Sequence, residues 1–467
     1  MKAKVFQRLA GLALAVMITG APLAALAQNA AAPENTTAAA SNTTTTAPAA
    51  APAAATPAPK IDTGDTAWML TSSVLVLMMT IPGLALFYAG MVRKKNILAT
   101  LAQSFGATCV ITVLWMVVGY SLAFTGSGKF IGDFKYIMLA PMGLNAVSSL
   151  APTIPESVYM MFQMTFAIIT PALIAGALAD RMKYSAFLIF MAAWLLLVYC
   201  PIAHWVWGGG WLGAAGALDY AGGTVVHLNA GTAGLVAALM LGKRKGLGTE
   251  NFAPANLAYS VIGASLLWVG WFGFNAGSAV TSNVNAGMAM AATQIATAAA
   301  SLAWMFAEWI IAKKPSVLGM VSGAVAGLVA ITPASGFVNA TGALWIGLAA
   351  GIVCYISAVH LKKVFGYDDA LDCWGVHGVG GALGAILTGV FALKEINPGS
   401  APKGGLLEGN AHQMILQFED VEATFVYCAI VTFLILAVLK YTIGIRVSEE
   451  VEIEGLDINL HGEMIHG

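Results

Sequence analysis

The chain has 467 residues, of which 58% are hydrophobic and only 10% are charged. With a mean hydropathy of +0.79, this composition excludes an ordinary soluble multidomain protein and predicts a polytopic membrane protein. The formal net charge of -1 indicates no nucleic-acid partner. The five cysteines fall in apolar segments without CxxC spacing, so we interpret them as packing residues.

The first two segments in chain order are a leader and a low-complexity arm. Three basic residues precede an apolar run that ends in the A-x-A pattern of Ala25-Leu26-Ala27, which predicts a cleaved signal peptide over residues 1–27. A signal anchor is the alternative. Residues 28–61 are almost entirely Ala, Thr, Pro, Asn and Ser, with too few large apolar groups to offset the entropy of ordering. We expect them to form a disordered extracytoplasmic arm.

Apolar runs long enough to cross a hydrocarbon core of roughly 30 Å recur along the rest of the chain. About eleven such runs are centred near Leu77, Trp115, Phe166, Leu196, Gly231, Leu267, Ala298, Ala326, Ala350, Gly381 and Leu434. An odd number of spans places the two ends of the chain on opposite sides of the membrane. We therefore predict an all-α protein with eleven transmembrane helices.

Basic residues set the orientation, because cytoplasmic loops carry an excess of Lys and Arg. One set of alternate loops, with the tail, holds Arg93, Lys94, Lys95, Arg181, Lys183, Lys243, Arg244, Lys245, Lys313, Lys314, Lys362, Lys363, Lys440 and Arg446. The opposite loops hold only Lys129, Lys135, Lys394 and Lys403. The N-terminus is therefore expected outside and the C-terminus in the cytoplasm.

Two histidines lie deep in glycine-spaced apolar segments and share one local frame. Each is followed by glycine at +4 and +7 and is preceded by an aspartate eight residues earlier. The two sets are Asp219, His227, Gly231 and Gly234, and Asp369, His377, Gly381 and Gly384. An ionisable side chain is costly in an apolar medium, so matched histidines indicate one site built from a duplicated half. Two unrelated core histidines are the alternative.

The histidines fall on the fifth and tenth predicted spans, so the two five-helix halves are expected to be inverted relative to each other. Eight helical residues cover about 12 Å, which places both histidines near the middle of the bilayer. The eleventh span has no partner and is expected to lie against the outside of the other ten. The predicted divisions are a membrane domain over 62–442, with repeats over about 62–242 and 256–391 and a last helix over about 418–441, and a tail over 443–467.

Aromatic residues and glycines gather at the predicted outer ends of three spans. The segments are Phe162 to Phe166, Ala203 to Gly210, and Gly270 to Ser278. Lipid anchoring at the interface is one interpretation of the aromatic residues. The glycines favour a second one, a close-packed vestibule whose aromatic faces attract a small cation by about 0.5 to 2 kcal/mol, with the Ser278 hydroxyl accepting its N–H.

No Arg or Lys lies within the predicted spans, and Asp219, Asp369 and Asp372 lie near their ends. A permanent ion is therefore costly in the middle of the membrane, whereas a cation that sheds its proton avoids that cost. Two neutral imidazoles would offer a polar line through an otherwise apolar bore. Asp219 has two interpretations, an electrostatic attractor and a helix cap.

Several long motifs occur together and in order along the chain. They are Leu86 to Gly90, Phe162 to Phe166, Trp207 to Gly210, Asp219 to His227, Gly270 to Ser278, Thr332-Pro333 and Asp372 to Gly378. In this the chain resembles the ammonium transporter family (Amt/Mep/Rh), bacterial Amt branch. The resemblance implies a homotrimer with one pore per subunit.

The same resemblance implies roles for individual residues. An outer substrate site comprises Trp207, Phe166 and Ser278, a gate comprises Phe166 and Phe274, and the pore is lined by His227 and His377. We add Asp219, Asp369 and Thr332 as structural or electrostatic residues. The expected activity is uptake of ammonium, with methylammonium as its analogue, across the cytoplasmic (inner) membrane. We expect no enzyme activity, no cofactor and no resident metal.

The tail carries two further motifs, Gly455-Leu456-Asp457 and His461-Gly462-Glu463. They resemble the regulatory tail of the family, which implies docking on the cytoplasmic face and binding of a trimeric PII-type nitrogen signal protein. A charged, solvated tail is the alternative.

Three other functions compete with ammonium uptake. A membrane ammonium sensor would use the same pore, although sensors of this family commonly carry a large cytoplasmic domain that the short tail does not supply. An Rh-like neutral gas channel is the second. The third is an intramembrane metalloenzyme, which is disfavoured because the chain has no HExxH or other ligand cluster.

Overall fold

The computed structural model describes residues 60–465, in which all regular elements are helical apart from two isolated β-bridges. The predicted signal peptide over 1–27 and residues 28–59 of the predicted arm lie outside the described residues. Within that range, ten helical segments are long and apolar enough to cross a membrane, and Val317–Ile331 is a shorter apolar helix. The predicted all-α membrane architecture is therefore confirmed, with ten to eleven spanning helices in the part of the chain described.

The first half of the membrane domain alternates α-helices with short π-helical or 3-10 turns, labelled η. In chain order its elements are α2 (Thr63–Met78), η1 (Met79–Leu84), α3 (Ala85–Met91), η2 (Lys94–Asn96), α4 (Ile97–Leu114), η3 (Trp115–Gly119), α5 (Tyr120–Phe124), η4 (Ile137–Leu139), α6 (Glu156–Leu178), α7 (Tyr184–Trp194), η5 (Leu195–Tyr199), α8 (Cys200–Val206), α9 (Trp211–Ala215), η6 (Gly223–Leu228) and α10 (Asn229–Leu241).

The second half and the tail follow the same alternation. Their elements are α11 (Leu257–Gly277), α12 (Val284–Ala312), α13 (Val317–Ile331), α14 (Ala340–Tyr355), η7 (Ile356–Leu361), α15 (Lys362–Phe365), η8 (Cys373–Gly378), α16 (Val379–Phe391), η9 (Leu406–Glu408), α17 (His412–Thr442), α18 (Glu449–Glu454) and η10 (Asp457–His461).

Polar side chains in the loops cap several of these helices. The capping residues of α2, α11, α12, α13 and α14 are Asp62, Asn256, Asn283, Ser316 and Asn339, and each accepts a hydrogen bond from a backbone N–H of the first turn. These N–H groups have no partner inside a helix, so a side-chain oxygen stabilises the helix start. Short polar loops thus determine where the long apolar helices begin.

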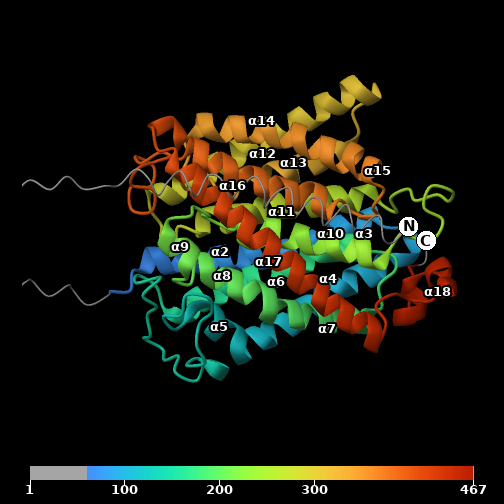
Figure 1. The fold of residues 1–467 in the computed structure, drawn as a ribbon, viewed down its shortest axis with the longest axis horizontal. Coiled ribbons are helices and arrows are strands. Elements are labelled where there is room, and N and C mark those ends of the chain that lie inside the picture. Colours follow the sequence, from blue (N-terminus) through green and yellow to red (C-terminus); the bar gives the residue numbers. More distant parts are fainter. Residues whose placement is uncertain (1–59, 466–467) are drawn as a thin grey trace, which may run out of the picture. The chain divides into compact units, whose positions relative to one another are not determined.

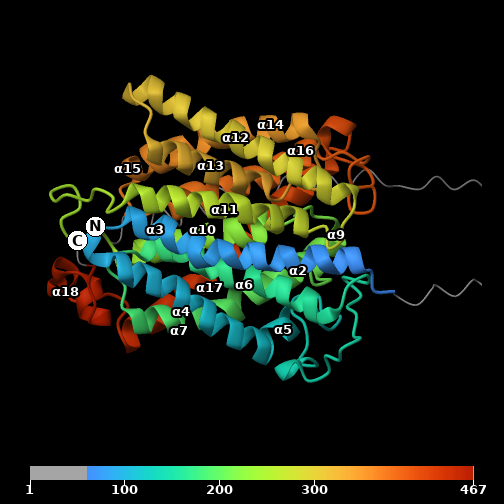
Figure 2. The same cartoon turned by 180° about the vertical axis from the view of Figure 1, so that it is seen from behind.

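The helices of the two halves lie on opposite sides of the bundle, as Figures 1 and 2 show, with α12, α13 and α14 along one side and α4, α5 and α7 along the other. Helix α17 runs obliquely across them and contacts α10 and α16, one helix from each half. Helix α17 begins at His412. Hydropathy had indicated a start at about 418, because Gln413, Gln417 and Asp420 make the first turns of the helix polar.

The two histidine-bearing segments match in length. η6 and η8 each have 6 residues, and α10 and α16, which continue them, each have 13. The two segments run in opposite directions. α10 ends at the tail, where the Leu241 carbonyl accepts a hydrogen bond from Arg446. α16 ends near Phe337, whose carbonyl accepts from Leu393 N and which lines a pocket that also contains Asp219. We call the end at Asp219 the pocket face and the end at Arg446 the tail face.

The two segments cross at glycines. A Cβ atom on Gly231 would lie 2.1 Å from the backbone nitrogen of Gly378, and one on Gly381 would lie 2.5 Å from the carbonyl oxygen of Gly223. No side chain fits between backbones this close, and glycine permits that approach. The reciprocal contacts bring His227 and His377, which flank the crossing, to the same depth in the bundle.

The tail packs against the tail face. The carboxylate of Asp457 accepts hydrogen bonds from Ala99 N at 2.8 Å and Leu98 N at 3.1 Å, at the start of α4. Leu456 N donates to the Asn96 side chain at 2.8 Å. These bonds join residues about 360 positions apart, so the tail is part of the folded bundle within the described residues.

Replacing Gly231 with alanine tests the crossing. The added methyl group would meet the backbone of Gly378, which has no flexible end that can move aside. We expect the free energy of unfolding to fall by about 1–3 kcal/mol, as in other overpacked cores. Thermal unfolding of the purified protein in detergent measures the loss.

Gly287→Ala in α12 is the matched control, because nothing lies within 4 Å of an added Cβ there. If Gly231→Ala unfolds at the same temperature as this control, the close crossing is not required.

Candidate functional site

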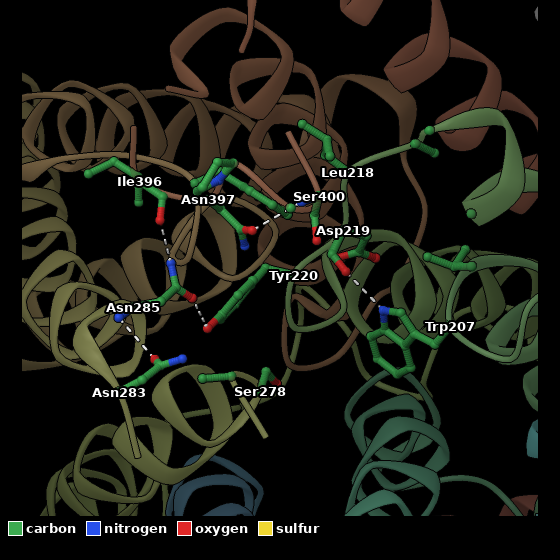
Figure 3. A pocket seen from close by; sticks show the side chains of 18 of the residues that line it. Trp207, Leu218, Asp219, Tyr220, Ser278, Asn283, Asn285, Ile396, Asn397 and Ser400 are labelled. Atoms are coloured by element: carbon green, nitrogen blue, oxygen red, sulfur yellow. Dashed lines mark hydrogen bonds between the residues drawn. The ribbon is translucent and has the colours of Figure 1, made fainter. Parts of the chain in front are cut away.

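A pocket of about 720 Å³ lies at the pocket face, between the loop before η6, the end of α11 and the loop after α16. Figure 3 shows Trp207, Asp219, Tyr220 and Ser278 around it. The sequence therefore predicted two lining residues of this pocket, Trp207 and Ser278, as members of one site, and the structure brings them to the same cavity.

Hydrogen bonds fix both side chains. The indole Nε1 of Trp207 donates to the Asp219 carbonyl at 2.8 Å, and Ser278 Oγ donates to the Phe274 carbonyl at 2.8 Å. Because the single hydroxyl hydrogen of Ser278 is used in that bond, Ser278 Oγ can only accept further hydrogen bonds. A ligand that carries N–H groups suits this serine better than one that carries only acceptors.

Two phenylalanines lie directly beneath Trp207. The ring centroids of Phe166 and Phe274 are 4.2 Å apart, and that of Phe166 is 5.8 Å from that of Trp207. Both phenylalanine side chains are buried, and Phe166 does not line the pocket itself. Phe166 thus separates the pocket from the interior, whereas the sequence had placed it in both the substrate site and the gate.

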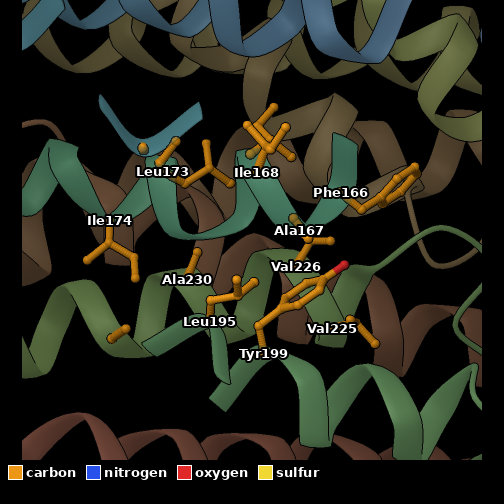
Figure 4. Packing of buried hydrophobic residues seen from close by; sticks show 14 of the residues in the cluster. Phe166, Ala167, Ile168, Leu173, Ile174, Leu195, Tyr199, Val225, Val226 and Ala230 are labelled. Atoms are coloured by element: carbon orange, nitrogen blue, oxygen red, sulfur yellow. The ribbon is translucent and has the colours of Figure 1, made fainter. Parts of the chain in front are cut away.

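The wall below Phe166 is apolar. Figure 4 shows the packing of α6 against η6 and α10, in which Ala167, Ile168, Val226 and Ala230 take part. All four are buried. None of these four packed side chains carries a charge, so an ion among them would lose its hydration without a compensating partner.

His227 and His377 meet in the interior. Their Nδ1 atoms are 3.3 Å apart and their ring centroids 5.4 Å apart. The His227 ring also stacks on Phe274 at 5.9 Å and on Trp271 at 5.3 Å. Trp271 is held in turn by a 2.9 Å hydrogen bond from Nε1 to the hydroxyl of Thr332, which gives this threonine a supporting position behind the ring.

The contact between the two Nδ1 atoms constrains their hydrogens. One nitrogen must donate and the other accept, because two N–H groups pointing at each other repel. A pair of neutral imidazoles meets this condition in either of two arrangements. His227 Nε2 is buried and has no hydrogen-bond partner among the described residues, so this nitrogen is available to form a hydrogen bond with a ligand.

Asp219 closes the start of η6. Its carboxylate accepts hydrogen bonds from the backbone N–H groups of Gly222, Gly223, Thr224 and Val225 at 2.6–3.1 Å, and from the Thr224 hydroxyl at 2.7 Å. These contacts are those of a helix cap. The same carboxylate lines the pocket, so its negative charge also lies where a cation would enter.

Asp369 occupies the matching position at the tail face. It accepts hydrogen bonds from Cys373 N at 3.0 Å and Trp374 N at 2.7 Å at the start of η8. Burial, with Asp372 close by, raises the pKa of Asp369 to about 6. Lys362 forms an ion pair with Asp372 beside it. The two halves thus cap their histidine-bearing segments in the same way.

Asp420 of α17 is fully buried and was not among the residues predicted for the site. Its Oδ2 lies 2.9 Å from the hydroxyl of Thr224, which also contacts Asp219. A pattern of polar residues at helical spacing could have revealed it, since Gln413, Gln417, Asp420, Thr424, Cys428 and Thr432 recur every three or four positions and are all buried. Within residues 60–465, no three His, Cys, Asp or Glu side chains gather so that they could hold a metal ion.

Comparison with known proteins identifies the family. A model of the Ammonium Transporter Family matches residues 67–466. The chain belongs to the ammonium transporter family. An ammonium transporter of Aquifex aeolicus is 53% identical over 406 residues, which cover 86% of this chain and 93% of the relative.

Solved structures of the family agree with this fold. The crystal structure of Candida albicans Mep2 is 36% identical, covers 84% of this chain and 88% of its own, and superposes with a TM-score of 0.79. A structure described as "Sensor Amt Protein" is 27% identical, covers 85% of this chain and 98% of its own, and gives a TM-score of 0.78. The chain is therefore a multi-pass ammonium transporter.

Asp219→Asn tests the cap of η6. Asparagine has one acceptor oxygen where aspartate has two, and its NH2 group would face backbone N–H donors. We expect the free energy of unfolding to fall by about 1–3 kcal/mol, the usual cost of a buried group without its partner. Thermal unfolding in detergent measures this change.

Asp62→Asn is the control, because this exposed aspartate caps α2 by a single bond to Asp65 N, which asparagine can also accept. Equal unfolding temperatures for the two variants would show that the Asp219 contacts add no stability.

Proposed function

We propose that this transporter binds NH4+ in the pocket at Trp207, that NH4+ gives its proton to the imidazole of His227 as it passes the Phe166–Phe274 pair, and that ammonia then moves along His227 and His377. One observation supports this route above others. Aromatic and imidazole rings follow one another from Trp207 to His377, with successive centroids 5.8, 4.2, 5.9 and 5.4 Å apart.

The pocket has three features that favour a small N–H-bearing cation. The Trp207 ring offers an aromatic face, which attracts a cation by about 0.5 to 2 kcal/mol. Ser278 Oγ is an acceptor, since its hydrogen is bound to the Phe274 carbonyl. Asp219 adds a negative charge on the pocket wall. Together these groups raise the local concentration of NH4+ over that of neutral solutes.

The buried phenylalanine pair then favours loss of the proton. An ion that leaves the pocket for the apolar interior loses a large free energy of hydration, whereas neutral ammonia loses a far smaller one. The two histidines offer hydrogen-bond partners below the phenylalanines, and a proton can follow separately from one imidazole to the other. Net transport of ammonia with a separate proton is the scheme we propose.

The membrane placement is part of the proposal. The distribution of basic residues supports an outward pocket face and a cytoplasmic tail face in the inner membrane. The N-terminal sequence supports a cleaved signal peptide over residues 1–27 and an extracytoplasmic arm over 28–61, and the resemblance to the family supports a homotrimer with one pore in each subunit. Native mass spectrometry of the purified protein measures its oligomeric state, and N-terminal sequencing identifies the first residue of the mature chain.

Ammonium-evoked current in proteoliposomes tests the conduction route. We expect current in the wild type and a loss of about tenfold or more, equivalent to about 1.4 kcal/mol or more, in both His227→Ala and His377→Ala. His412→Ala, on an exposed residue at the start of α17, should conduct like the wild type. Each variant must first match the wild type in thermal unfolding.

Three outcomes contradict the scheme. Wild-type current in both pore variants removes the histidines from the route. A silent wild type that still equilibrates ammonia favours a neutral gas channel, and one that conducts neither but binds ammonium favours a sensor. Competition by methylammonium separates the ammonium route from passage of other gases.

We also propose that the tail binds a trimeric PII-type nitrogen signal protein. The docked position of Asp457 and the contact of His461 with Tyr184, whose rings are 4.9 Å apart, support a folded recognition surface at the tail face. Removal of residues 449–467 should abolish binding of the purified PII-type protein from the same cell, measured by calorimetry with each effector.

Lys394→Ala, on an exposed loop near the pocket face, should leave that binding unchanged. The regulatory role is refuted if no effector condition gives binding, or if the truncated protein binds as well as the full chain.

A further inference from the structure

The last helix places a second carboxyl group behind the pore. Asp420 of α17 is fully buried against η6 and α10, and its Oδ2 lies 2.9 Å from Thr224 Oγ1. Thr224 Oγ1 also lies 2.7 Å from Asp219 Oδ2. One hydroxyl therefore bridges two carboxyl groups from distant parts of the chain.

The number of hydrogens in this bridge is limited. A threonine hydroxyl has one hydrogen, so it donates to one carboxyl and can only accept from the other. Both short contacts are hydrogen bonds only if one carboxyl carries a proton. If both carboxyls were ionised, one would meet the lone pairs of the hydroxyl, in a buried place where that repulsion is not screened.

The surroundings decide which carboxyl holds the proton. Asp219 accepts four backbone N–H bonds, which stabilise the ionised form. Asp420 accepts no backbone N–H bond among the described residues: only the hydroxyls of Thr224 and, one turn along α17, Thr424 lie beside it, and its buried Oδ1 has no partner at hydrogen-bond distance there. No Lys, Arg or His forms an ion pair with Asp420 in the described part of the chain. A neutral acid fits the second environment and an anion the first.

We propose that Asp219, Thr224 and Asp420 share one proton, held at rest on Asp420, and that its transfer to Asp219 controls the negative charge beneath the pocket. At rest Asp420 Oδ2 donates to Thr224 Oγ1, and Thr224 donates to Asp219. In the transfer, the Asp420 proton moves to Thr224 Oγ1 while the threonine hydrogen moves to Asp219 Oδ2. Two O–H bonds break and two form, so the charge passes from Asp219 to Asp420.

This inference rests on the proposed function, because the transfer matters only if a cation enters beside Asp219. With the charge on Asp219 the pocket favours a cation, and with the charge on Asp420 that attraction is weakened. Asp420 is therefore a positioning residue for charge. It does not touch the substrate, and it acts through Thr224.

Infrared spectroscopy tests the resting proton. A protonated carboxylic acid has a carbonyl stretch outside the amide bands, and this stretch shifts in D2O. We expect one such band from a buried acid in the wild type, its loss in Asp420→Asn, and its retention in Glu422→Gln, which alters an exposed residue of the same helix. If the wild-type and Asp420→Asn spectra are the same in this region, Asp420 is ionised and the proposal is wrong.

Ammonium-evoked current tests the transfer. Asparagine can still donate a hydrogen bond to Thr224 but cannot give up a proton, so Asp420→Asn should fold like the wild type and conduct at least about threefold less. Thr224→Val, which removes the bridge, should lower the current in the same way while keeping the acid band. Glu422→Gln should conduct like the wild type.

The outcomes separate this inference from the proposed function. Wild-type current in folded Asp420→Asn shows a static proton and overturns the transfer, while the pore scheme stands. An absence of current in the wild type overturns the proposed function and the transport role of Asp420 together. Retention of the acid band in Asp420→Asn together with its loss in Asp219→Asn would show that the proton belongs to Asp219 and would also overturn the proposal.

Discussion

The close crossing of the two histidine-bearing segments is the contact on which the rest of the site depends. Gly231 lies against Gly378 and Gly381 lies against Gly223, so two backbones meet where side chains would normally keep them apart. This approach sets the 3.3 Å contact between His227 and His377. The rings of Trp207, Phe166 and Phe274 follow one another toward that pair, so a shift at the crossing would separate the two histidines, which are the deepest rings of the series.

The carboxylates of Asp219 and Asp369 are held at the ends of the crossing segments by hydrogen bonds to backbone. Asp219 and Asp369 each take up N–H groups at the start of a segment, one at either face. The interior between them holds aromatic and imidazole rings and small apolar side chains. A protein built this way separates the place that attracts a charge from the place that excludes it, which a selective route for a weak acid requires.

The sequence predicted much of this arrangement because its signals are local. Residue spacing alone paired His227 with His377, and the odd offset between the fifth and the tenth span predicted the antiparallel crossing. Contacts between distant segments were beyond such signals. The ring contact between Phe166 and Trp207 is one such contact, and the first turns of α17, from His412, are another case because Gln413 and Gln417 lower their hydropathy. The spacing of buried polar residues along α17 was a local signal for Asp420, but its contact with Thr224, 196 residues away, was not.

The start of α4 has no cap of its own, and Asp457 of the tail supplies it from the other end of the chain. Undocking the tail would break the hydrogen bonds from Leu98 N and Ala99 N to this carboxylate, each of which contributes about 1.5–3 kcal/mol when the acceptor is charged. Asn96, which holds Leu456, also contacts Asp180, and Asp180 pairs with Arg93 and Arg244. The tail therefore takes part in the contacts that join three loops, and a protein that binds the tail would also act on the hydrogen bonds and ion pairs between those loops.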